Sequence, residues 1–251
     1  LDYPICLIQP KRILETSAWN EHVPFAMFLV DLLKPKVFVE LGTHTGVSYS
    51  AFCQAVKERG LKTLCTAVDT WEGDKHAGIY GKDILQDLKS HHDPLYSDFS
   101  RLIQSSFDEA SIKFSDNEID LLHIDGLHTY EAVRHDFLSW LPKLSDRALV
   151  LFHDIAEKKD DFGVWKLWDE LKLKYPSFEL IHGHGLGVLA VGNKYSPGID
   201  LLIKTTDEGQ LVREFFKILG ARLTTEIQVR KLQLEISEKD RRMEDNINKL
   251  D

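Results

Sequence analysis

The sequence predicts an α/β fold in which seven mostly parallel strands form one sheet with helices on both faces, followed by a helical, coiled-coil-like tail. Strand-like and helix-like patterns alternate over most of the chain, which is typical of a parallel sheet. The first strand runs into an acidic residue and a glycine-punctuated turn, as in folds that bind nucleotides at the carboxyl edge of a sheet. A seven-residue apolar repeat near the end of the chain predicts the tail.

The apolar patterns place the first elements as follows. They predict a helix over 13–34, a strand over 37–41, a helix over 48–59 and a strand over 63–68. Pro35 ends the first helix, while Ser48 is the expected N-cap of the second and Gly60 closes it. Residues 70–98 are polar and irregular, with a helix over 82–91. A connection of this length in a compact domain is usually functional, so this segment and Trp19–Phe25 are expected to shape the acceptor pocket.

The second half of the sheet repeats the alternation. The sequence predicts strands near 101–104, 119–124 and 147–152, helices over 107–114, 130–141 and 160–174, and final strands over 178–182 and 186–192. Gly183-His-Gly185 joins the last two strands, which can therefore pair as a hairpin. The other connections are long enough to return the chain to a parallel neighbour.

The tail has its own pattern. Apolar residues recur every seven positions at Val229, Ile236, Met243 and Leu250, with Leu232 between the first two and Lys239 and Asn246 interrupting the second seam. Such a repeat predicts a left-handed coiled coil, and so a homo-oligomer formed through the tail. A solvated helix that links to a domain outside this sequence fits the pattern equally well.

Composition limits the functions to consider. A chain of 251 residues with 43% hydrophobic content is long enough for one substantial core, expected over 1–206, plus the tail over 207–251. No stretch approaches the roughly 20 apolar residues of a membrane span, and the net charge of −9 disfavours nucleic-acid substrates. Three cysteines without a Cys-x-x-Cys pattern favour a reducing, cytoplasmic location.

The end of the first strand is the strongest indication of a ligand site. Glu40 is followed by Gly42 and Gly46, and glycines let a backbone approach a ligand closely. The middle glycine of a dinucleotide fingerprint is missing, so a nicotinamide oxidoreductase is the least favoured interpretation. Asp69 ends the second strand, where an acid commonly binds ribose hydroxyls. The pattern predicts a ligand with a ribose and an amino-acid end.

Polar residues also follow the fourth and fifth strands. Asp125, His153 and Asp154 are expected to converge near the reactive end of the cofactor, as a ligand set suited to Mg²⁺ or Mn²⁺. A cation there would make a substrate hydroxyl more acidic. His128 is the candidate catalytic base, with Asp125 beside it. Asp125 could instead cap the next helix or hold the amino group of the cofactor, and His123, which alternates with apolar neighbours, is expected to be a hydrogen-bonded core histidine.

Four segments together resemble a known family. Residues 37–48, Asp69–Asp74, His123–Asp136 and Leu151–Asp154 resemble the class I S-adenosylmethionine-dependent methyltransferases, which have a Rossmann-like fold. More narrowly, they are similar to a branch that methylates hydroxyl groups of sugars or small molecules and is found beside glycosyltransferases. The similarity covers about residues 10–195.

The resemblance implies roles for particular residues. Glu40, Gly42 and Gly46, with Thr43 and Ser48 of the same turn, would hold the methionine half of S-adenosylmethionine, Asp69 the ribose, and Ser106 and Phe107 the adenine. Related metal-dependent enzymes place an acid, a basic histidine and two further acids where this chain has Asp125, His128, His153 and Asp154. His153 therefore stands where an acid is usual.

The expected function is O-methyl transfer from S-adenosylmethionine to a hydroxyl of a small molecule or glycan, with a glycosyltransferase domain expected in the full-length chain. Two other interpretations stay open. A hydroxylase on the same scaffold would use His128, His153 and Asp154 as an iron site. A docking module without catalysis would use the tail instead. Oxygen and Fe²⁺ dependence, or loss of function on removing the tail, distinguishes them.

Overall fold

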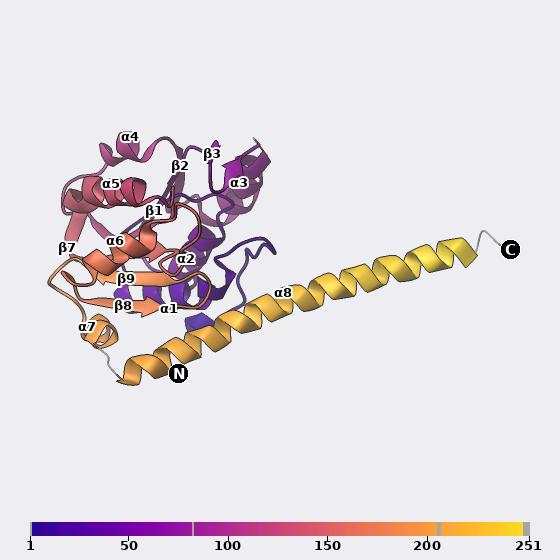
Figure 1. Ribbon diagram of the computed structural model, residues 1–251. Coiled ribbons are helices and arrows are strands. Elements are labelled where there is room, and N and C mark those ends of the chain that lie inside the picture. The colour runs from indigo at the N-terminus through magenta and orange to yellow at the C-terminus, as the bar shows by residue number, and fades with distance from the viewer. Residues whose placement is uncertain (1, 82, 205–206, 248–251) are drawn as a thin grey trace.

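The computed structural model describes residues 2–81, 83–204 and 207–247 and confirms the predicted seven-stranded sheet (Figure 1). Its strands are β1 (Val37–Leu41), β2 (Leu64–Asp69), β5 (Ser100–Gln104), β6 (Ile119–Ile124), β7 (Leu144–His153), β8 (Ser177–Leu180) and β9 (Leu186–Ala190). Their spatial order is β5-β2-β1-β6-β7-β9-β8, and pairing is parallel except that β9 runs antiparallel to β7 and to β8. The strand order reverses between β1 and β6, where open α/β folds bind their ligands.

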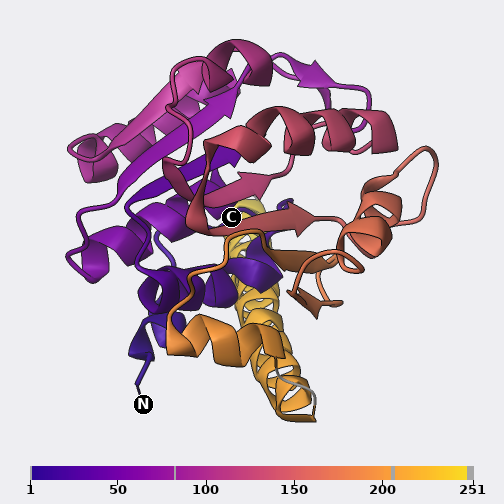
Figure 2. The same ribbon diagram turned by 90° about the vertical axis from the view of Figure 1, so that its left-hand side faces the viewer.

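Helices cover both faces of the sheet (Figure 2). They are α1 (Val23–Leu33), α2 (Val47–Glu58), α3 (Asp83–Tyr96), α4 (Phe107–Ser111), α5 (Tyr130–Trp140), α6 (Val164–Leu171), α7 (Pro197–Lys204) and α8 (Asp207–Ile247). A hydrophobic core lies on each face of the sheet, and alternate residues of a strand point into one core or the other. In β1, Phe38 packs with α1 and α2, whereas Val39 and Leu41 pack with α4, α5 and α6.

The register of the parallel strands brings their carboxyl ends together. Glu40 of β1 pairs with His123 of β6, and Ile124 of β6 pairs with Phe152 of β7. The amide of Asp125 then donates to the carbonyl of Leu41 at 2.8 Å. The residues that follow β1, β6 and β7 therefore lie side by side at one edge of the sheet.

The predicted N-terminal helix over 13–34 is too long. A 3-10 turn over Asn20–His22 precedes α1, which begins only at Val23 with Pro24 in its first turn. Proline is favoured there because the first helical amides have no partner within the helix. Asn20 donates from Nδ2 to the carbonyl of Leu14 at 2.8 Å and fixes the irregular segment before it. The apolar periodicity of 13–19 belongs to a loop rather than to a helix.

Other element boundaries also differ. Gly46, with φ of 74°, is the N-cap of α2, and Ser48 lies inside its first turn rather than at the cap. The predicted helix over 160–174 is only Val164–Leu171. It begins late because the amide of Gly163 donates to the carbonyl of His128 at 2.7 Å instead of entering a helix. The segment 70–81 forms a small hairpin, β3 (Gly73–Asp74) with β4 (Gly78–Ile79), and α7 was not predicted.

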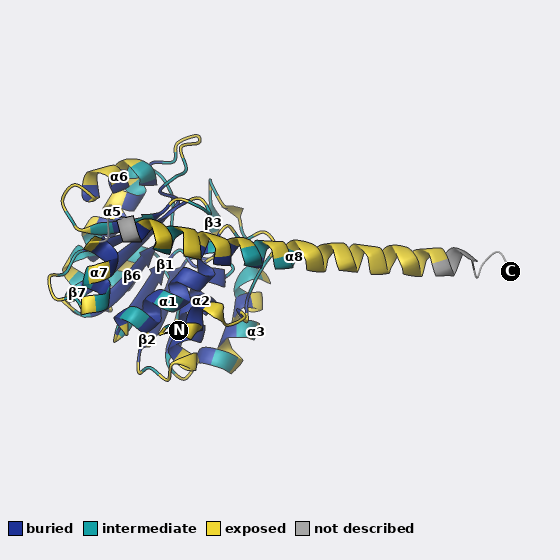
Figure 3. Cartoon of the chain, turned by 90° about the horizontal axis from the view of Figure 1, so that it is seen from below, coloured by how far each residue is buried: buried dark blue, intermediate teal, exposed yellow. Residues whose placement is uncertain are grey.

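The predicted tail is one continuous helix, α8. Its first part packs on the body through Phe216, Leu219 and Leu223, and Arg213 donates to the carbonyl of Glu179 at 2.9 Å. Its second part projects away from the body, and residues 228–243 are all exposed, although Lys231 still pairs with Glu15 (Figures 1 and 3). Leu250 of the predicted heptad lies outside the described residues. Within those residues, no helix combines the length and apolar character that crossing a membrane requires.

Candidate active site

A cavity of about 580 Å³ opens at the carboxyl ends of β1, β2, β6 and β7. The predicted site residues on its wall are Gly42, Thr43, Ser48, Asp69, Ser106, Phe107, Asp125, His128, His153 and Asp154. Glu40 and Gly46 do not line it. The sheet edge thus brings together ten predicted positions from both halves of the domain.

Glu40 lies behind the cavity wall rather than on it. Its side chain is fully buried, and its Oε2 is 2.9 Å from Nδ1 of His123, which is also fully buried. Burial raises the pKa of the Glu40 carboxyl, and His123 and Ser48 oppose that shift. Oε1 of Glu40 has no protein partner. His123 is therefore the hydrogen-bonded core histidine that the sequence predicted, while direct contact of Glu40 with a cofactor stays a prediction.

The two glycines of the first turn serve different neighbours. Gly42 has φ of 84°, and a Cβ there would lie 2.1 Å from the carbonyl oxygen of Asp125. Gly46 has φ of 74°, and a Cβ there would lie 2.4 Å from Leu88 of α3. Gly42 therefore lets the turn after β1 pass against the loop after β6, whereas Gly46 permits packing between α2 and α3.

Asp69 organises the turns around it. Its Oδ2 accepts hydrogen bonds from the amides of Thr43 at 2.9 Å and His44 at 2.8 Å, and its Oδ1 accepts one from the amide of Trp71 at 2.7 Å. His44 and Trp71 both have positive φ, of 48° and 52°. Such strained conformations in residues other than glycine persist only where the surroundings hold them. The carboxylate of Asp69 is thus the anchor of the turn after β1, and its predicted contact with a ribose stays a prediction.

Ser106 and Phe107, at the start of α4, line the part of the cavity beside Gly126. Phe107 packs so closely on Gly126 that a Cβ at residue 126 would lie 2.5 Å from its ring. Ser106 is the N-cap of α4 and shares a capping box with Glu109, so its hydroxyl is already occupied. This part of the cavity suits a planar aromatic group, with Phe107 as its platform.

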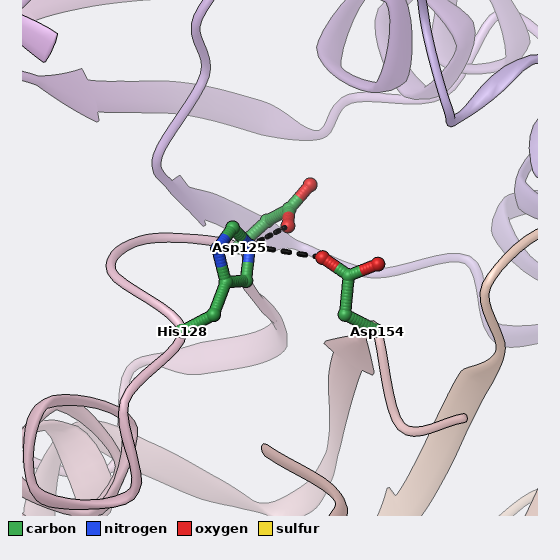
Figure 4. A group of neighbouring side chains, drawn as sticks. All are labelled: Asp125, His128 and Asp154. Atoms are coloured by element: carbon green, nitrogen blue, oxygen red, sulfur yellow. Dashed lines mark hydrogen bonds and ion pairs between the residues drawn. The ribbon is translucent and has the colours of Figure 1, made fainter. Parts of the chain in front are cut away.

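Two carboxylates and two imidazoles cluster in the part of the cavity that follows β6 and β7. Nε2 of His128 lies 3.3 Å from Oδ1 of Asp125 and 3.0 Å from Oδ2 of Asp154, and the three side chains point toward one another (Figure 4). Nδ1 of His153 lies 3.4 Å from Oδ1 of both acids, on the buried side of the cluster. Asp154 has φ of 62°, a conformation that turns the chain sharply at the end of β7. The predicted convergence of Asp125, His153 and Asp154 is observed, and His128, the predicted base, lies in the same cluster.

The cluster shifts the pKa values of its members. Burial alone would lower the pKa of each histidine, but Asp125 and Asp154 outweigh it and raise the pKa of His128 to about 9 and that of His153 to about 10. Burial alone would raise the pKa of each acid, but the two histidines outweigh it and lower both. The cluster is therefore an ion-paired set in which imidazolium groups balance the carboxylates.

The same cluster offers a donor set for a cation. Among the described residues, Asp125, His128 and Asp154 place one ligand atom each within 4.8 Å of one another. Two carboxylate oxygens and one imidazole nitrogen fit Mg²⁺, Mn²⁺ or a similar divalent ion. The metal-binding set predicted from the sequence was Asp125, His153 and Asp154. In the structure His153 also contacts both acids, but the nitrogen that converges with the two carboxylates belongs to His128, the predicted base.

The 70–81 hairpin and the loop before α6 meet beside His128. The ring of Phe162 stacks on His128 with 4.9 Å between centroids and contacts His76 at 4.5 Å. Asp161 accepts from Nε2 of His76 at 2.5 Å and pairs with Lys75. The sequence predicted that 70–98 shapes the pocket, but no local pattern signalled that residues near 162 pack against it.

The N-terminal segment completes the wall. Thr16, Ser17, Ala18 and Trp19 line the cavity, and Trp19 stacks on His153 with 5.7 Å between centroids. Tyr80 lines the cavity on the other side and stacks on His44 at 4.4 Å. Of these, only Trp19 and the 70–98 segment were expected at the pocket. Phe25, at the end of the expected Trp19–Phe25 stretch, belongs to the core instead.

Sequence comparisons agree with this geometry. Residues 39–155 match the model of a family described as a methyltransferase domain. A curated protein of Sinorhizobium fredii, the uncharacterized protein y4gI, is 45% identical over 217 residues, which is 85% of this chain. The chain spans only about a quarter of the length of that relative, 24%.

Solved structures share the fold. The O-methyltransferase TomG of Streptomyces achromogenes, determined with S-adenosylmethionine, superimposes with a TM-score of 0.52 at 12% identity, over 76% of this chain and 95% of its own. The methyltransferase PaMTH1 of Podospora anserina, determined with S-adenosylhomocysteine, gives 0.52 at 14% identity, over 67% and 77%. The chain therefore has the same Rossmann-like fold as these methyltransferase structures, and its residues 39–155 match a family described as a methyltransferase domain.

Proposed function

We propose that this protein transfers a methyl group from S-adenosylmethionine to a hydroxyl group, most specifically a hydroxyl of a sugar in a glycan or a glycosylated small molecule. The observation that carries the proposal is the position of Asp125, His128 and Asp154. They lie in the same cavity as the Gly42 turn and the Phe107 platform. One cavity therefore holds a place for an adenosyl group and a set of groups able to handle the proton of a hydroxyl.

The cofactor fits the cavity from Phe107 to the Gly42 turn. A flat apolar surface suits adenine, and the turn after β1 offers closely approached backbone to the methionine end. The strands that carry these features flank the point where strand order reverses, which is the usual ligand crevice of such sheets. We assign Thr43, Ser48 and Asp69 to the same cofactor wall because they line it.

The chemical step needs alignment and proton removal. The bond from sulfur to the methyl carbon breaks as the bond from the acceptor oxygen forms, and the products are the methyl ether and S-adenosylhomocysteine. The hydroxyl proton passes to His128, which reaches the cavity beside Asp125. Nε2 of His128 faces Asp125 and Asp154, so it can accept this proton only when another positive charge balances the two carboxylates.

Asp125 and Asp154 would hold a divalent cation, with His128 or His153 as the neighbouring nitrogen. Bound there, such an ion would make a coordinated hydroxyl more acidic. The residues of the chain then position the acceptor: the ring of Phe162 fixes the plane of His128, and Asp161 holds His76 beside it.

A sugar suits the open side of this cavity. Thr16, Ser17, Asp74 and His76 line it with groups that can exchange hydrogen bonds with several hydroxyls. We also place the domain beside a glycosyltransferase domain in the full-length protein, in a reducing cytoplasm where Cys6, Cys53 and Cys65 stay free, as they are in the structure. A hydroxylase is less well supported, because the convergent donor set has two carboxylates and one histidine, the reverse of the usual non-haem iron triad.

Calorimetry with S-adenosylmethionine and S-adenosylhomocysteine tests the first part of this proposal. We expect binding of both, with thermal stabilisation of the protein. Absence of heat and of stabilisation with either ligand would end the assignment. Transfer of a labelled methyl group to a panel of glycosides, matched aglycones and catechols then tests the acceptor class. Methylation of aglycones or catechols alone would overturn the sugar assignment while leaving the methyltransferase intact.

A further inference from the structure

Helix α8 exposes one apolar stripe along most of its length. On the projecting part it consists of Val229, Leu232, Ile236 and Met243. On the part that packs against the body it continues backwards through Ile218, Phe215 and Leu211. Three polar residues, Arg222, Thr225 and Lys239, occupy the remaining positions of the stripe, so that successive positions are three or four residues apart. The exposed fractions of the apolar members run from 41% at Phe215 to 74% at Leu211. The stripe therefore begins well before the heptad that the sequence showed.

The stripe is distinct from the face that holds α8 on the domain. Phe216, Leu219 and Leu223 are buried there, on a different side of the helix from Phe215 and Ile218. At 1.5 Å per residue, the stripe from Leu211 to Met243 is about 50 Å long. Apolar positions at this spacing are those that enter the seam of a two-stranded coiled coil.

We propose that α8 pairs with α8 of a second copy of this chain in antiparallel orientation, centred near residue 227. The charges on the helix favour this partner and this direction. Three positions of the stripe are polar: Arg222, Thr225 and Lys239. In a parallel, in-register pair, each Arg222 would face the other Arg222 and each Lys239 the other Lys239 within the seam. Like charges in these positions oppose association.

The antiparallel register removes those conflicts. Ile236 then packs against Ile218 of the second copy, and Met243 against Leu211. Lys239 lies over the ring of Phe215, which is a favourable cation–π arrangement, and Arg222 lays its aliphatic stem along Leu232. Beside the seam, Glu214 of one copy faces Arg242 of the other, which gives two attractive pairs per dimer.

A groove between α8 and the body supports this register. It is lined by Tyr3, Cys6 and Phe28 together with Leu211, Phe215 and Phe216 of α8, and its volume is about 330 Å³. In the antiparallel pair, Met243 of the second copy arrives at Leu211, which forms one edge of this groove. The projecting end of one helix is thereby covered by the domain of the other copy, and both ends of the stripe are buried.

Sedimentation of the whole chain over a range of concentrations tests the pairing. We expect a monomer–dimer equilibrium that Ile236→Asp shifts toward monomer, raising the dissociation constant by about a hundredfold or more because each dimer buries two of the introduced charges. Leu234→Asp is the matched control, since Leu234 is equally apolar and 65% exposed on α8 but lies off the stripe. A monomer at every concentration, or equal effects of both variants, would overturn the proposal.

Cysteine cross-linking tests the direction. The native cysteines Cys6, Cys53 and Cys65 are buried, so introduced thiols can be followed separately. We expect a mixture of Leu211→Cys and Met243→Cys chains to give a mixed disulfide dimer under mild oxidation, with little dimer from either variant alone. Efficient dimers from each variant alone, without the mixed species, would show a parallel pair and overturn the antiparallel assignment.

Discussion

Gly42 and Asp125 touch through their backbones: a Cβ at residue 42 would lie 2.1 Å from the Asp125 carbonyl oxygen. This contact joins the turn after β1 to the loop that carries the acids and His128. The amide of Asp125 also donates to the carbonyl of Leu41, so the turn proposed to hold the cofactor and the cluster proposed to accept the proton are packed directly against each other. A substitution at Gly42 is therefore expected to disturb both the turn after β1 and the loop that carries Asp125 and His128.

Replacing Gly42 with alanine is expected to weaken S-adenosylhomocysteine binding at least about tenfold and to lower the melting temperature, because the methyl group meets the Asp125 carbonyl. Gly60→Ala is the matched control: φ is 60°, but nothing lies within 4 Å of its Cβ position. In that variant alanine must adopt a positive φ, which lowers the free energy of unfolding by about 1–2 kcal/mol, but the affinity for S-adenosylhomocysteine should be unchanged. Calorimetry compares the two. Equal affinity of both variants would show that the turn does not contact the cofactor.

His128→Ala is expected to lower kcat by about 10²–10⁴ while leaving cofactor affinity nearly unchanged, since the imidazole takes the acceptor proton. His135→Ala serves as the control, because His135 pairs with Asp108 on the surface and is exposed. Steady-state kinetics with the best glycoside acceptor measures both. Full turnover by the His128 variant would remove it as the base.

A divalent cation is expected to raise the melting temperature of the wild type and to be required for turnover. Asp154→Asn removes one of the two carboxylates that would hold it, so the stabilisation by Mn²⁺ or Mg²⁺ should be lost. Asp146→Asn, at an exposed ion pair with Lys194, should keep it. Thermal melts with and without chelator provide the measurement. Unchanged activity in chelator argues for a metal-independent enzyme.

Asp136 makes stability depend on pH. Burial raises its pKa from 3.8 to about 7 in the folded protein. The folded state therefore holds this proton more tightly than the unfolded state, and stability falls as the pH rises from about 4 to about 7. Asp136→Asn cannot ionise, so it should be more stable than the wild type at pH 8, by about 4 kcal/mol at most, with little gain at pH 4.

Urea unfolding of the Asp136 variant at both pH values checks this. Asp98→Asn is a suitable comparison because Asp98 is exposed. A gain at pH 8 that is no larger than the gain at pH 4 would show that the buried carboxyl is not the cause.

The grouping of the polar residues that follow β6 and β7 was predictable, because parallel strands bring their carboxyl ends to one edge of the sheet regardless of how the loops fold. That rule placed Asp125, His153 and Asp154 together, and His128 was expected beside them because it follows Asp125 by three residues. The sequence could not show that His128, rather than His153, joins the two acids in the convergent donor set, since this depends on the sharp turn at Asp154 and on the packing of Phe162. Long-range side-chain contacts of this kind leave no local pattern.

The misplaced elements have a similar cause. Residues 13–19 were expected to be helical, yet they form a loop in which Ile13 and Leu14 pack on the core and Thr16–Trp19 line the cavity. Just before this loop, Arg12 donates from Nε to the carbonyl of Thr45 at 2.7 Å and pairs with Asp87 of α3. Glu40 was expected on the cavity wall because it stands at a strand end, but its side chain faces His123 inside the sheet layer.

The three amide hydrogen bonds accepted by Asp69 have a consequence for how the protein is inhibited. Two of them hold the turn after β1 and the third holds the turn after β2, so little ordering of these turns would accompany binding of the proposed cofactor. On the proposed function, such a rigid cradle would recognise adenosine and the amino-acid end, which the spent cofactor also has. Clearance of S-adenosylhomocysteine by other enzymes should therefore govern how fast this one can cycle.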